Sequence, residues 1–206
     1  GKAMKISKPK RTIIRRIKES ITEIEYKKLM SYTIGDESIK EHSRQNLLRT
    51  FTILYFTGLR LNELQQMNLK HIKELLDNGV TKLLLPKTKS ERKLFAGDEF
   101  KKQLLKLFTL TDEVNLNERI ITKASVKSNR IGINHDVFIK QVNQKLKEIL
   151  GSGYTSHSFR QGLITEMGSK QINTKIISKF IGHSDVKTTM RYINPTDEDL
   201  KGAMIR

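Results

Sequence analysis

The chain has 206 residues, which is enough for one well-packed domain or for one domain with a small appendage. It contains no cysteine, so disulfides and thiol-based metal sites are excluded, and we expect a cytoplasmic location. No apolar run approaches the roughly 18 residues that cross a bilayer, and no secretory signal is visible, so we expect no membrane partner.

Positive charge dominates the composition and is unevenly distributed. Lys and Arg number 39 against 22 acidic residues, which makes a formal net charge of +17. A lysine-rich, AT-biased genome could produce such a bias, but eight basic residues and no acidic residue lie within residues 2–18. Such an arm would neutralise phosphates and release counterions, so a polyanion is the expected partner and salt should weaken its binding. We therefore predict a basic arm or linker at residues 1–20 and a folded domain at 21–206.

Apolar periodicity and capping residues predict a mainly helical chain. Ser20 with Glu23, and Thr22 with Glu25, form overlapping capping boxes ahead of the first helix. Gly58 should end the second helix in the left-handed conformation. The predicted helices cover residues 22–32, 43–57, 61–66, 98–108, 134–150, 158–168, 174–181, 186–193 and 197–204.

In the stretch from residue 70 to residue 96 the spacing of apolar residues is no longer that of a helix, and the pattern predicts a small antiparallel sheet. The Asn78-Gly79 dipeptide is a hairpin turn signal, and residues 81–85 and 92–95 have the composition of strands. A polar turn at residues 87–91 should join these two strands. The predicted fold class is therefore mainly α with a small antiparallel β-sheet (α+β).

The second half of the chain is predicted with fewer landmarks. Asp98 should cap the helix at 98–108 and turn its apolar side chains inward, namely Phe100, Leu104, Leu105 and Phe108. Residues 109–133 are expected to be mostly irregular, with a run at 119–122 that could be extended. Thr196 should cap the final helix, whose first turn is acidic, as the helix dipole prefers.

Five side chains could together break and rejoin a phosphodiester without a metal. Arg60 and Arg160 suit the charged oxygens of a phosphorane, because a guanidinium donates two hydrogen bonds at once. A tyrosine phenol ordinarily has a pKa of about 10, so Tyr192 could attack phosphorus and also leave again. His157 and His183 could transfer protons or bind the phosphate. Each residue alone has an ordinary structural explanation, and only their order along the chain favours chemistry.

Three segments carry that order: TGLRLNEL at 57–64, HSFR at 157–160, and IGHSD continuing to TTMRY at 181–192. They resemble the tyrosine recombinases, also called phage-type integrases, and the resemblance covers about residues 22–200. The last segment is similar to Xer-type recombinases. The resemblance implies a tyrosine recombinase catalytic-domain fold and site-specific recombination of double-stranded DNA. It also implies self-assembly on DNA as a tetrameric synapse, with no cofactor, metal, nucleotide or small-molecule substrate.

The resemblance further implies a role for each site residue. Arg60 and Arg160 would hold the scissile phosphate, and His183 would donate to a phosphate oxygen. Tyr192 would attack to form a 3′-phosphotyrosyl link, with His157 accepting its proton.

A lysine of the hairpin would protonate the leaving 5′ oxygen. Lys87 is the first choice for this general acid, and Lys89 stays open because hairpin length varies. Glu63 would orient Arg60 or support the fold rather than act on the substrate. The other histidines lack ligand spacing, so we expect no metal site.

The chain also departs from the family pattern. Gln161-Gly162 stands where relatives have a histidine and a small polar residue, and we expect this change to alter support for the helix rather than chemistry. The family has an N-terminal helical domain that grips the other face of DNA, whereas only the arm at 1–20 precedes the catalytic-like region. Either that domain is missing here or the protein is a short member, and in both cases this chain alone should bind its site weakly. The tail at 196–206 should dock on a neighbouring protomer.

Two alternatives stay open at this point. The first is a non-catalytic DNA-binding protein on the same scaffold, and the second is a type IB topoisomerase-like or telomere-resolving enzyme. An intact set of site residues disfavours the first alternative. The short length and the Xer-like final segment disfavour the second.

Overall fold

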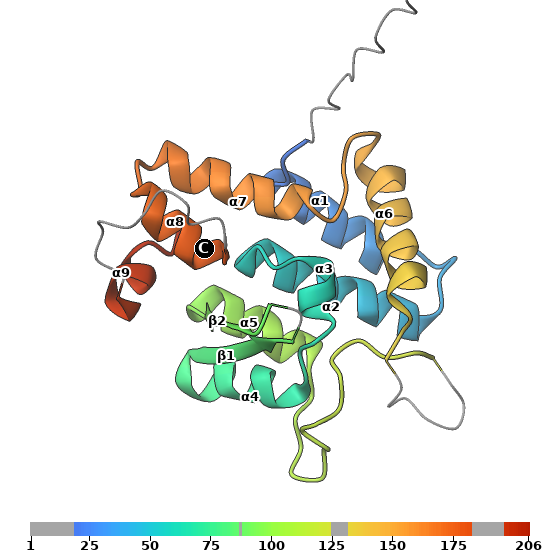
Figure 1. The fold of residues 1–206 in the computed structure, drawn as a ribbon. Helices are drawn as coiled ribbons and strands as arrows, with labels where there is room; N and C mark the ends of the chain where they lie inside the picture. The colour runs from blue at the N-terminus through green and yellow to red at the C-terminus, as the bar shows by residue number, and fades with distance from the viewer. Residues whose placement is uncertain (1–18, 87, 125–131, 183–195) are drawn as a thin grey trace, which may run out of the picture.

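A computed structural model of the chain describes residues 19–86, 88–124, 132–182 and 196–206 (Figure 1). Within these ranges the chain is mainly helical, with one two-stranded antiparallel sheet, as expected. The elements in chain order are α1 (Glu23–Ile34), α2 (Glu41–Thr57), α3 (Leu61–Leu64), α4 (Leu69–Asn78), β1 (Val80–Leu85), β2 (Ser90–Phe95), α5 (Asp98–Leu107), α6 (His135–Leu150), α7 (Ser158–Ser169), α8 (Thr174–Ile181) and α9 (Asp197–Gly202). No helix in this part of the chain is both long enough and apolar enough to cross a membrane.

Helix α2 forms the centre of the molecule. Nearly every residue in its second half is buried, and it packs against α1, α3, α5 and α7. Figure 1 shows α1, α6 and α7 on one side of α2, and the hairpin with α4 and α5 on the other. Because α2 is surrounded, it can be apolar on all sides, unlike a surface helix. The segment that follows α2 therefore starts from a firmly held point.

Glycine and asparagine caps explain several helix ends that the sequence predicts. Gly58 ends α2 in the left-handed conformation, with φ at +65°. Asn134 begins α6, and its side chain accepts hydrogen bonds from the backbone N–H groups of Asp136 and Val137. Thr196 caps α9 in the same way, through the N–H of Asp199. These predictions are confirmed, and the bounds of α8 match those expected.

The predicted sheet is present, but the prediction that it begins near residue 70 is wrong. Residues 69–78 form helix α4 instead, since Leu69, Ile72 and Leu75 recur at helical spacing behind the N-cap Asn68. Gly79, with φ at +72°, ends this helix rather than forming a hairpin turn. The strands pair from Val80 with Phe95 to Leu85 with Ser90, so the hairpin turn lies between residues 85 and 90.

Smaller differences concern α5 and the irregular segment. Leu105 is 66% exposed and does not face the core, because it falls on the opposite side of α5 from Phe100 and Leu104. Gly97 rather than Asp98 occupies the N-cap position. The expected extended run at 119–122 is reduced to isolated bridges at Arg119 and Thr122. The predicted arm at 1–20, apart from its last two residues, and the predicted helix at 186–193 lie outside the described residues.

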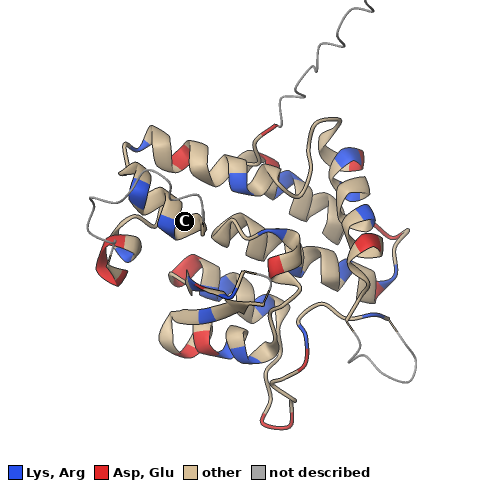
Figure 2. Cartoon of the chain, in the orientation of Figure 1, with Lys and Arg blue, Asp and Glu red and all other residues tan. Residues whose placement is uncertain are grey.

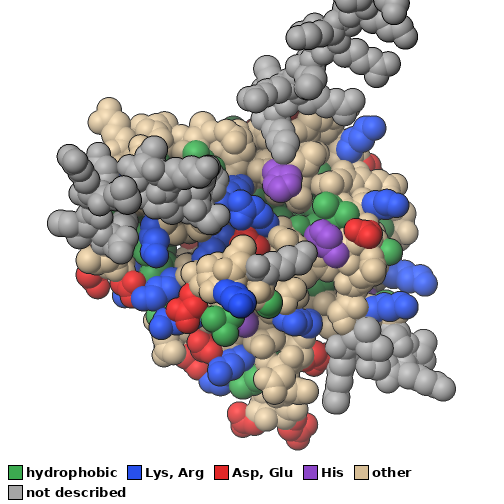
Figure 3. Space-filling model, viewed as in Figure 1, with side chains coloured by type: hydrophobic (Ala, Val, Ile, Leu, Met, Phe, Trp, Pro, Cys, Tyr) green, Lys and Arg blue, Asp and Glu red, His purple; other side chains and the backbone are tan. Residues whose placement is uncertain are grey.

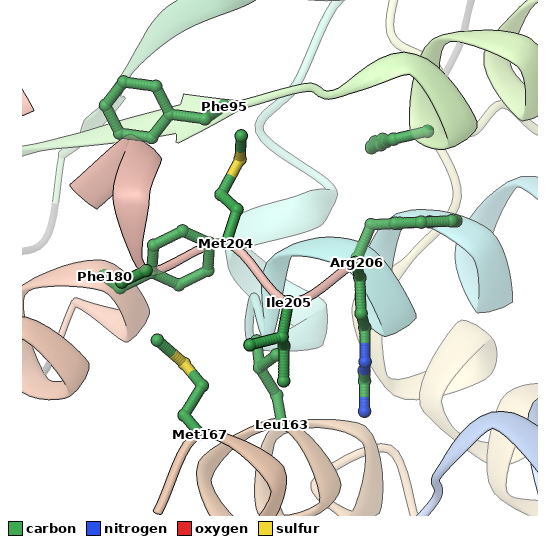
Figure 4. A pocket seen from close by; sticks show the side chains of 10 residues that line it. Phe95, Leu163, Met167, Phe180, Met204, Ile205 and Arg206 are labelled. Carbon is green, nitrogen blue, oxygen red and sulfur yellow. The ribbon is translucent and has the colours of Figure 1, made fainter. Parts of the chain in front are cut away.

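The C-terminal tail packs on its own chain in this structure. Leu200 and Ala203 are buried in a second apolar cluster with Phe180 of α8. The side chains of Met204 and Ile205 lie among apolar residues of β2, α7 and α8 around a cavity of only about 10 Å³ (Figure 4). Within this single chain the tail completes the core beside α7 and α8, and its docking on a neighbouring protomer stays a prediction.

Candidate active site

Arg60 is positioned by the sharp turn after α2. The left-handed Gly58 lets the chain leave α2 directly, and the backbone N–H of Leu59 is held by the Thr57 hydroxyl at 3.2 Å. Arg60 then caps α3, and its backbone N–H donates to a carboxylate oxygen of Glu63 at 2.8 Å. The Arg60 guanidinium is 41% exposed and lies 4.0 Å from the other oxygen of Glu63. The buried Glu63 therefore orients Arg60, as the sequence suggested.

Arg160 reaches the same turn from helix α7. Its side chain is buried, and Nη1 donates to the carbonyl of Gly58 at 3.0 Å. The pKa of Arg160 is lowered to about 10, mainly by burial and also by the nearby charge of Arg60, while the charge of Glu63 opposes the shift. Since this value is still above neutral pH, Arg160 stays protonated. The structure thus brings Arg60 and Arg160 together from positions 100 residues apart.

A third arginine, Arg92 of β2, joins this group and was not predicted. It is only 3% exposed, and Nη2 donates to the carbonyls of Thr57 at 2.6 Å and Phe180 at 3.2 Å. Its Nη1 lies 3.5 Å from Glu63. Burial lowers the pKa of Arg92 to about 9, with Glu63 opposing the shift and the other two arginines adding to it. The available signal was an arginine at an inward position of a strand, two residues before the buried Leu94.

The four residues Arg60, Glu63, Arg92 and Arg160, called here the arginine cluster, carry more positive than negative charge. Glu63 is the carboxylate that contacts this group among the described residues. In the same part of the chain, Nε and Nη1 of Arg92 and Nη2 of Arg160 are buried without a hydrogen-bond partner. Buried donors of this kind are unfavourable unless a ligand satisfies them. An anion with several oxygens, such as a phosphate, fits this requirement.

His157 precedes Arg160 by one helical turn. It occupies the N-cap position of α7, is exposed, and its backbone N–H donates to the Thr155 hydroxyl at 3.3 Å. Residues three apart on a helix lie on the same face, so His157 and Arg160 both face the same side of α7.

A backbone crossing near the start of α7 explains the departure at Gln161-Gly162. The N–H of Ile21 donates to the carbonyl of Ser158 at 2.9 Å. A Cβ added at Gly162 would lie 2.0 Å from the carbonyl oxygen of Ile21. Only glycine allows the chain ahead of α1 to cross α7 this closely. Gly162 therefore has a packing role at the start of α7, and the expectation that the change leaves the chemistry unaltered stays a prediction.

The other predicted site residues, Lys87, His183 and Tyr192, lie outside the described residues. Gly182, the residue before His183, packs against the side chain of Arg92: a Cβ there would lie 2.8 Å from Cδ of Arg92. Lys89, the alternative general acid, is exposed at the hairpin turn and has a positive φ of 50°. Its position in the turn leaves the choice between the two lysines open.

A groove of about 610 Å³ opens beside the arginine cluster, between α3 and the hairpin turn. Arg60 lies in its wall together with Arg119 and His135, and the amides of Gln65 and Gln66 also line it. Arg119 donates to the backbone carbonyl of Gln66, and Nδ1 of His135 lies 2.5 Å from Oε1 of Gln65. The lining thus combines these polar and basic groups with the apolar side chains of Leu85, Pro86, Ile121 and Ile133.

Basic side chains continue around this region. Figure 2 shows Lys and Arg on the hairpin, α7 and α8, with acidic residues on α9. On the face seen in Figure 3, basic and histidine side chains gather near the middle of the molecule. In the described ranges no group of three or more histidine or acidic residues is placed to hold a metal ion.

Comparison with known proteins agrees with this geometry. The profile described as the phage integrase family matches residues 19–199. The chain is 26% identical to tyrosine recombinase XerC of Treponema denticola over an alignment of 168 residues, with a coverage of 73% of this chain and 52% of that protein. It is also 26% identical to tyrosine recombinase XerA of Saccharolobus solfataricus over 154 residues, or 75% of this chain and 47% of the relative. The chain thus spans about half the length of these relatives.

Solved structures show the same fold. The crystal structure of XerA recombinase superposes with a TM-score of 0.59 at 20% identity, covering 89% of this chain and 62% of that one. The XerH site-specific recombinase bound to its difH substrate gives a TM-score of 0.60 at 18% identity, covering 84% of this chain and 49% of the other. The Tn1549 transposon integrase in complex with a circular intermediate DNA gives 0.57 at 20% identity, with coverages of 91% and 65%. Because the family match spans residues 19–199, most of the sequence, the chain belongs to the phage integrase family.

Proposed function

We propose that the chain is the catalytic part of a site-specific DNA recombinase that breaks and rejoins strands through a 3′-phosphotyrosyl intermediate. The observation that carries this proposal is the arginine cluster. It brings Arg60 and Arg160 to one place and leaves Nη2 of Arg160 without a hydrogen-bond partner, so that this donor is available for a phosphate oxygen. A scaffold that only recognised DNA bases would have no use for such a site.

Each step of the proposed reaction conserves atoms and charge. The phenol oxygen of Tyr192 attacks phosphorus while His157 accepts the phenol proton. The bond from phosphorus to the 5′ oxygen breaks, and Lys87 supplies the proton that this oxygen needs. Arg60 and Arg160, with His183, stabilise the charge that grows on the phosphate oxygens. In the rejoining step, the 5′-hydroxyl of a second strand attacks the same phosphorus and gives its proton to Lys87. The bond from phosphorus to the Tyr192 oxygen breaks, and His157 returns the proton to the phenol, so no metal, nucleotide or cofactor is consumed.

Double-stranded DNA is the proposed partner. Two of the structural relatives are named as complexes with DNA, XerH with difH and the Tn1549 integrase with circular intermediates. The groove beside the arginine cluster would hold the strand next to the scissile phosphate, and the basic arm would add phosphate contacts. Four protomers would assemble on two DNA sites. Because the protein must reach DNA, the proposed location is the cytoplasm.

Covalent adduct formation tests the proposal. A pool of labelled duplexes with random central sequence and a nick near each candidate site is incubated with the protein. DNA that migrates more slowly in a denaturing gel, because protein is covalently attached to it, is then recovered. The nick lets the short downstream piece diffuse away after cleavage, so the adduct accumulates. We expect adducts with the natural chain and none with Tyr192→Phe, which loses only the attacking oxygen. Tyr32→Phe is the matched control, since Tyr32 lies 61% exposed on α1 and should leave the yield unchanged.

Other outcomes separate the alternatives. Retention of DNA without any adduct would identify a non-catalytic DNA-binding protein. Relaxation of every supercoiled plasmid, regardless of sequence, would identify a topoisomerase-like activity.

A further inference from the structure

Arg92 joins the two chain segments that lead into the proposed phosphate-binding residues. Its Nη2 donates to the carbonyl of Thr57, three residues before Arg60, at 2.6 Å. The same nitrogen donates to the carbonyl of Phe180, three residues before His183, at 3.2 Å. A single guanidinium on the hairpin therefore connects the end of α2 with the end of α8.

Its third contact is with Glu63, the residue that orients Arg60. Nη1 of Arg92 lies 3.5 Å from Oε1 of Glu63, and this oxygen also accepts the backbone N–H of Arg60. A change in the position of Arg92 would therefore move Glu63, and the movement of Glu63 would in turn displace Arg60. Lysine could not replace this arrangement, because one ammonium lacks the planar fork that reaches partners in different directions.

Gly182 gives an independent indication that this contact is specific. The residue has φ at +70°, and a Cβ there would come within 2.8 Å of Cδ and 3.0 Å of Nε of Arg92. The chain before His183 thus rests directly on the aliphatic stem and the guanidinium of Arg92. A side chain at residue 182 would therefore displace either Arg92 or the end of α8.

We propose that Arg92 is a positioning residue of the strand-cleavage reaction: it sets the spacing between the turn that carries Arg60 and the end of α8, the helix that precedes His183 in the sequence. This inference rests on the proposed function. Arg92 is the most deeply buried arginine of the cluster, at 3% exposed, and the DNA contacts are assigned to Arg60 and Arg160. Its loss should therefore slow cleavage of bound DNA and change DNA affinity little, whereas a purely structural arginine would affect stability alone.

Arg49 supplies the matched control. It also donates to two backbone carbonyls, those of Leu107 and Ile120, both at 3.1 Å, and neither belongs to the site. Arg92→Lys and Arg49→Lys are compared for thermal unfolding, for duplex Kd, and for the single-turnover rate of adduct formation at saturating protein below the unfolding transition. We expect Arg92→Lys to reduce that rate by roughly 10²-fold, the typical cost of a small misplacement. Its Kd should stay within about 3-fold of the natural chain, since phosphate contacts dominate affinity. Arg49→Lys should lower the unfolding temperature and leave the rate unchanged.

A second pair keeps the test decisive if Arg92→Lys does not fold. Gly182→Ala and Gly79→Ala both place alanine at a left-handed helix end, but only the first meets Arg92. We expect slower cleavage from Gly182→Ala and reduced stability alone from Gly79→Ala. Natural-rate cleavage by Arg92→Lys or by Gly182→Ala would overturn the positioning role while leaving the recombinase proposal intact. Absence of adducts with the natural chain would instead overturn the recombinase proposal, and the positioning role with it.

Discussion

Two buried or half-buried arginines of this chain, Arg49 and Arg92, have very different surroundings. Arg49 donates to two carbonyls, and its guanidinium lies 4.2 Å from the centre of the Phe108 ring, so it supports loops far from the arginine cluster. Arg92 also donates to two carbonyls, but it shares one carboxylate with Arg60 and retains buried donors without partners.

The difference between Arg49 and Arg92 shows that the unfavourable arrangement, buried guanidiniums close to one another, occurs at the arginine cluster. Burying like charges close together lowers stability, and the pKa of Arg92 and that of Arg160 are lowered accordingly. Strain and perturbed pKa values of this kind gather at functional sites, where a ligand relieves them. Arg49 shows that the same side chain can be accommodated elsewhere in the chain without neighbouring guanidiniums.

Removing the carboxylate of the arginine cluster should have the largest effect. Glu63→Gln keeps an acceptor for the backbone N–H of Arg60 but leaves the buried guanidinium of Arg92 without its ion pair. We expect the free energy of unfolding to fall by about 3–5 kcal/mol, as when one partner of a buried pair is lost. Urea denaturation measures it, with the exposed Glu41→Gln as control, which should cost less than about 1 kcal/mol. Equal losses in both variants would remove the distinction between the two kinds of site.

Arg160→Ala should act on the reaction rather than on DNA affinity. One preorganised donor to a developing oxyanion is typically worth about 10²- to 10³-fold in rate, so adduct formation should fall by that factor. Duplex affinity should fall only modestly, because a single phosphate contact is a small part of the binding by a chain of charge +17. Arg49→Ala should leave the cleavage rate of folded protein unchanged. A parallel loss of affinity and rate would mean that Arg160 is a general DNA-binding residue.

Gly162→Ala tests the scaffold beside the arginine cluster. The added Cβ would lie 2.0 Å from the Ile21 carbonyl oxygen, so backbone must move, at a cost of about 1–3 kcal/mol of overpacking. Gly168→Ala on the same helix is the control, since nothing lies within 4 Å of its Cβ position. It should be neutral or stabilising, because alanine favours a helix. Calorimetric unfolding of both variants decides the point; matching stabilities would show that the chain before α1 is not held at Gly162.

The smallest expected effect is the pH dependence of a scaffold ion pair. Lys145 donates to Asp36, and this bond, followed by hydrogen bonds from Ser38, holds the pKa of Asp36 well below its usual range. A carboxyl with a lowered pKa in the folded state stabilises it above the unfolded pKa, about 3.9, and loses this contribution as the pH falls further. Asp36→Asn should therefore be less stable than the natural chain at pH 7.

Unfolding midpoints of Asp36→Asn and the natural chain should converge as the pH is lowered below about 4. The adduct-forming rate of the folded variant at neutral pH should be unchanged. A stability difference that is the same at every pH would mean that the ion pair contributes nothing through the charge of Asp36.

Local signals account for what the sequence predicted well. The caps at Gly58, Asn134 and Thr196 depend on a few neighbouring residues, so they can be recognised without the rest of the chain. The errors arose where a local pattern has two explanations. Asn78-Gly79 suits a hairpin and a helix end equally, and the helix spacing of residues 69–78 decided between them.

The sequence by itself determined the helical character, the basic charge and the motif residues Arg60, His157 and Arg160, because each depends on composition or short spacing. Only the tertiary structure decided that Arg92 joins two distant turns and that Gly162 must lack a side chain. Both facts depend on segments far apart in sequence coming within a few ångströms of each other, which no local pattern encodes.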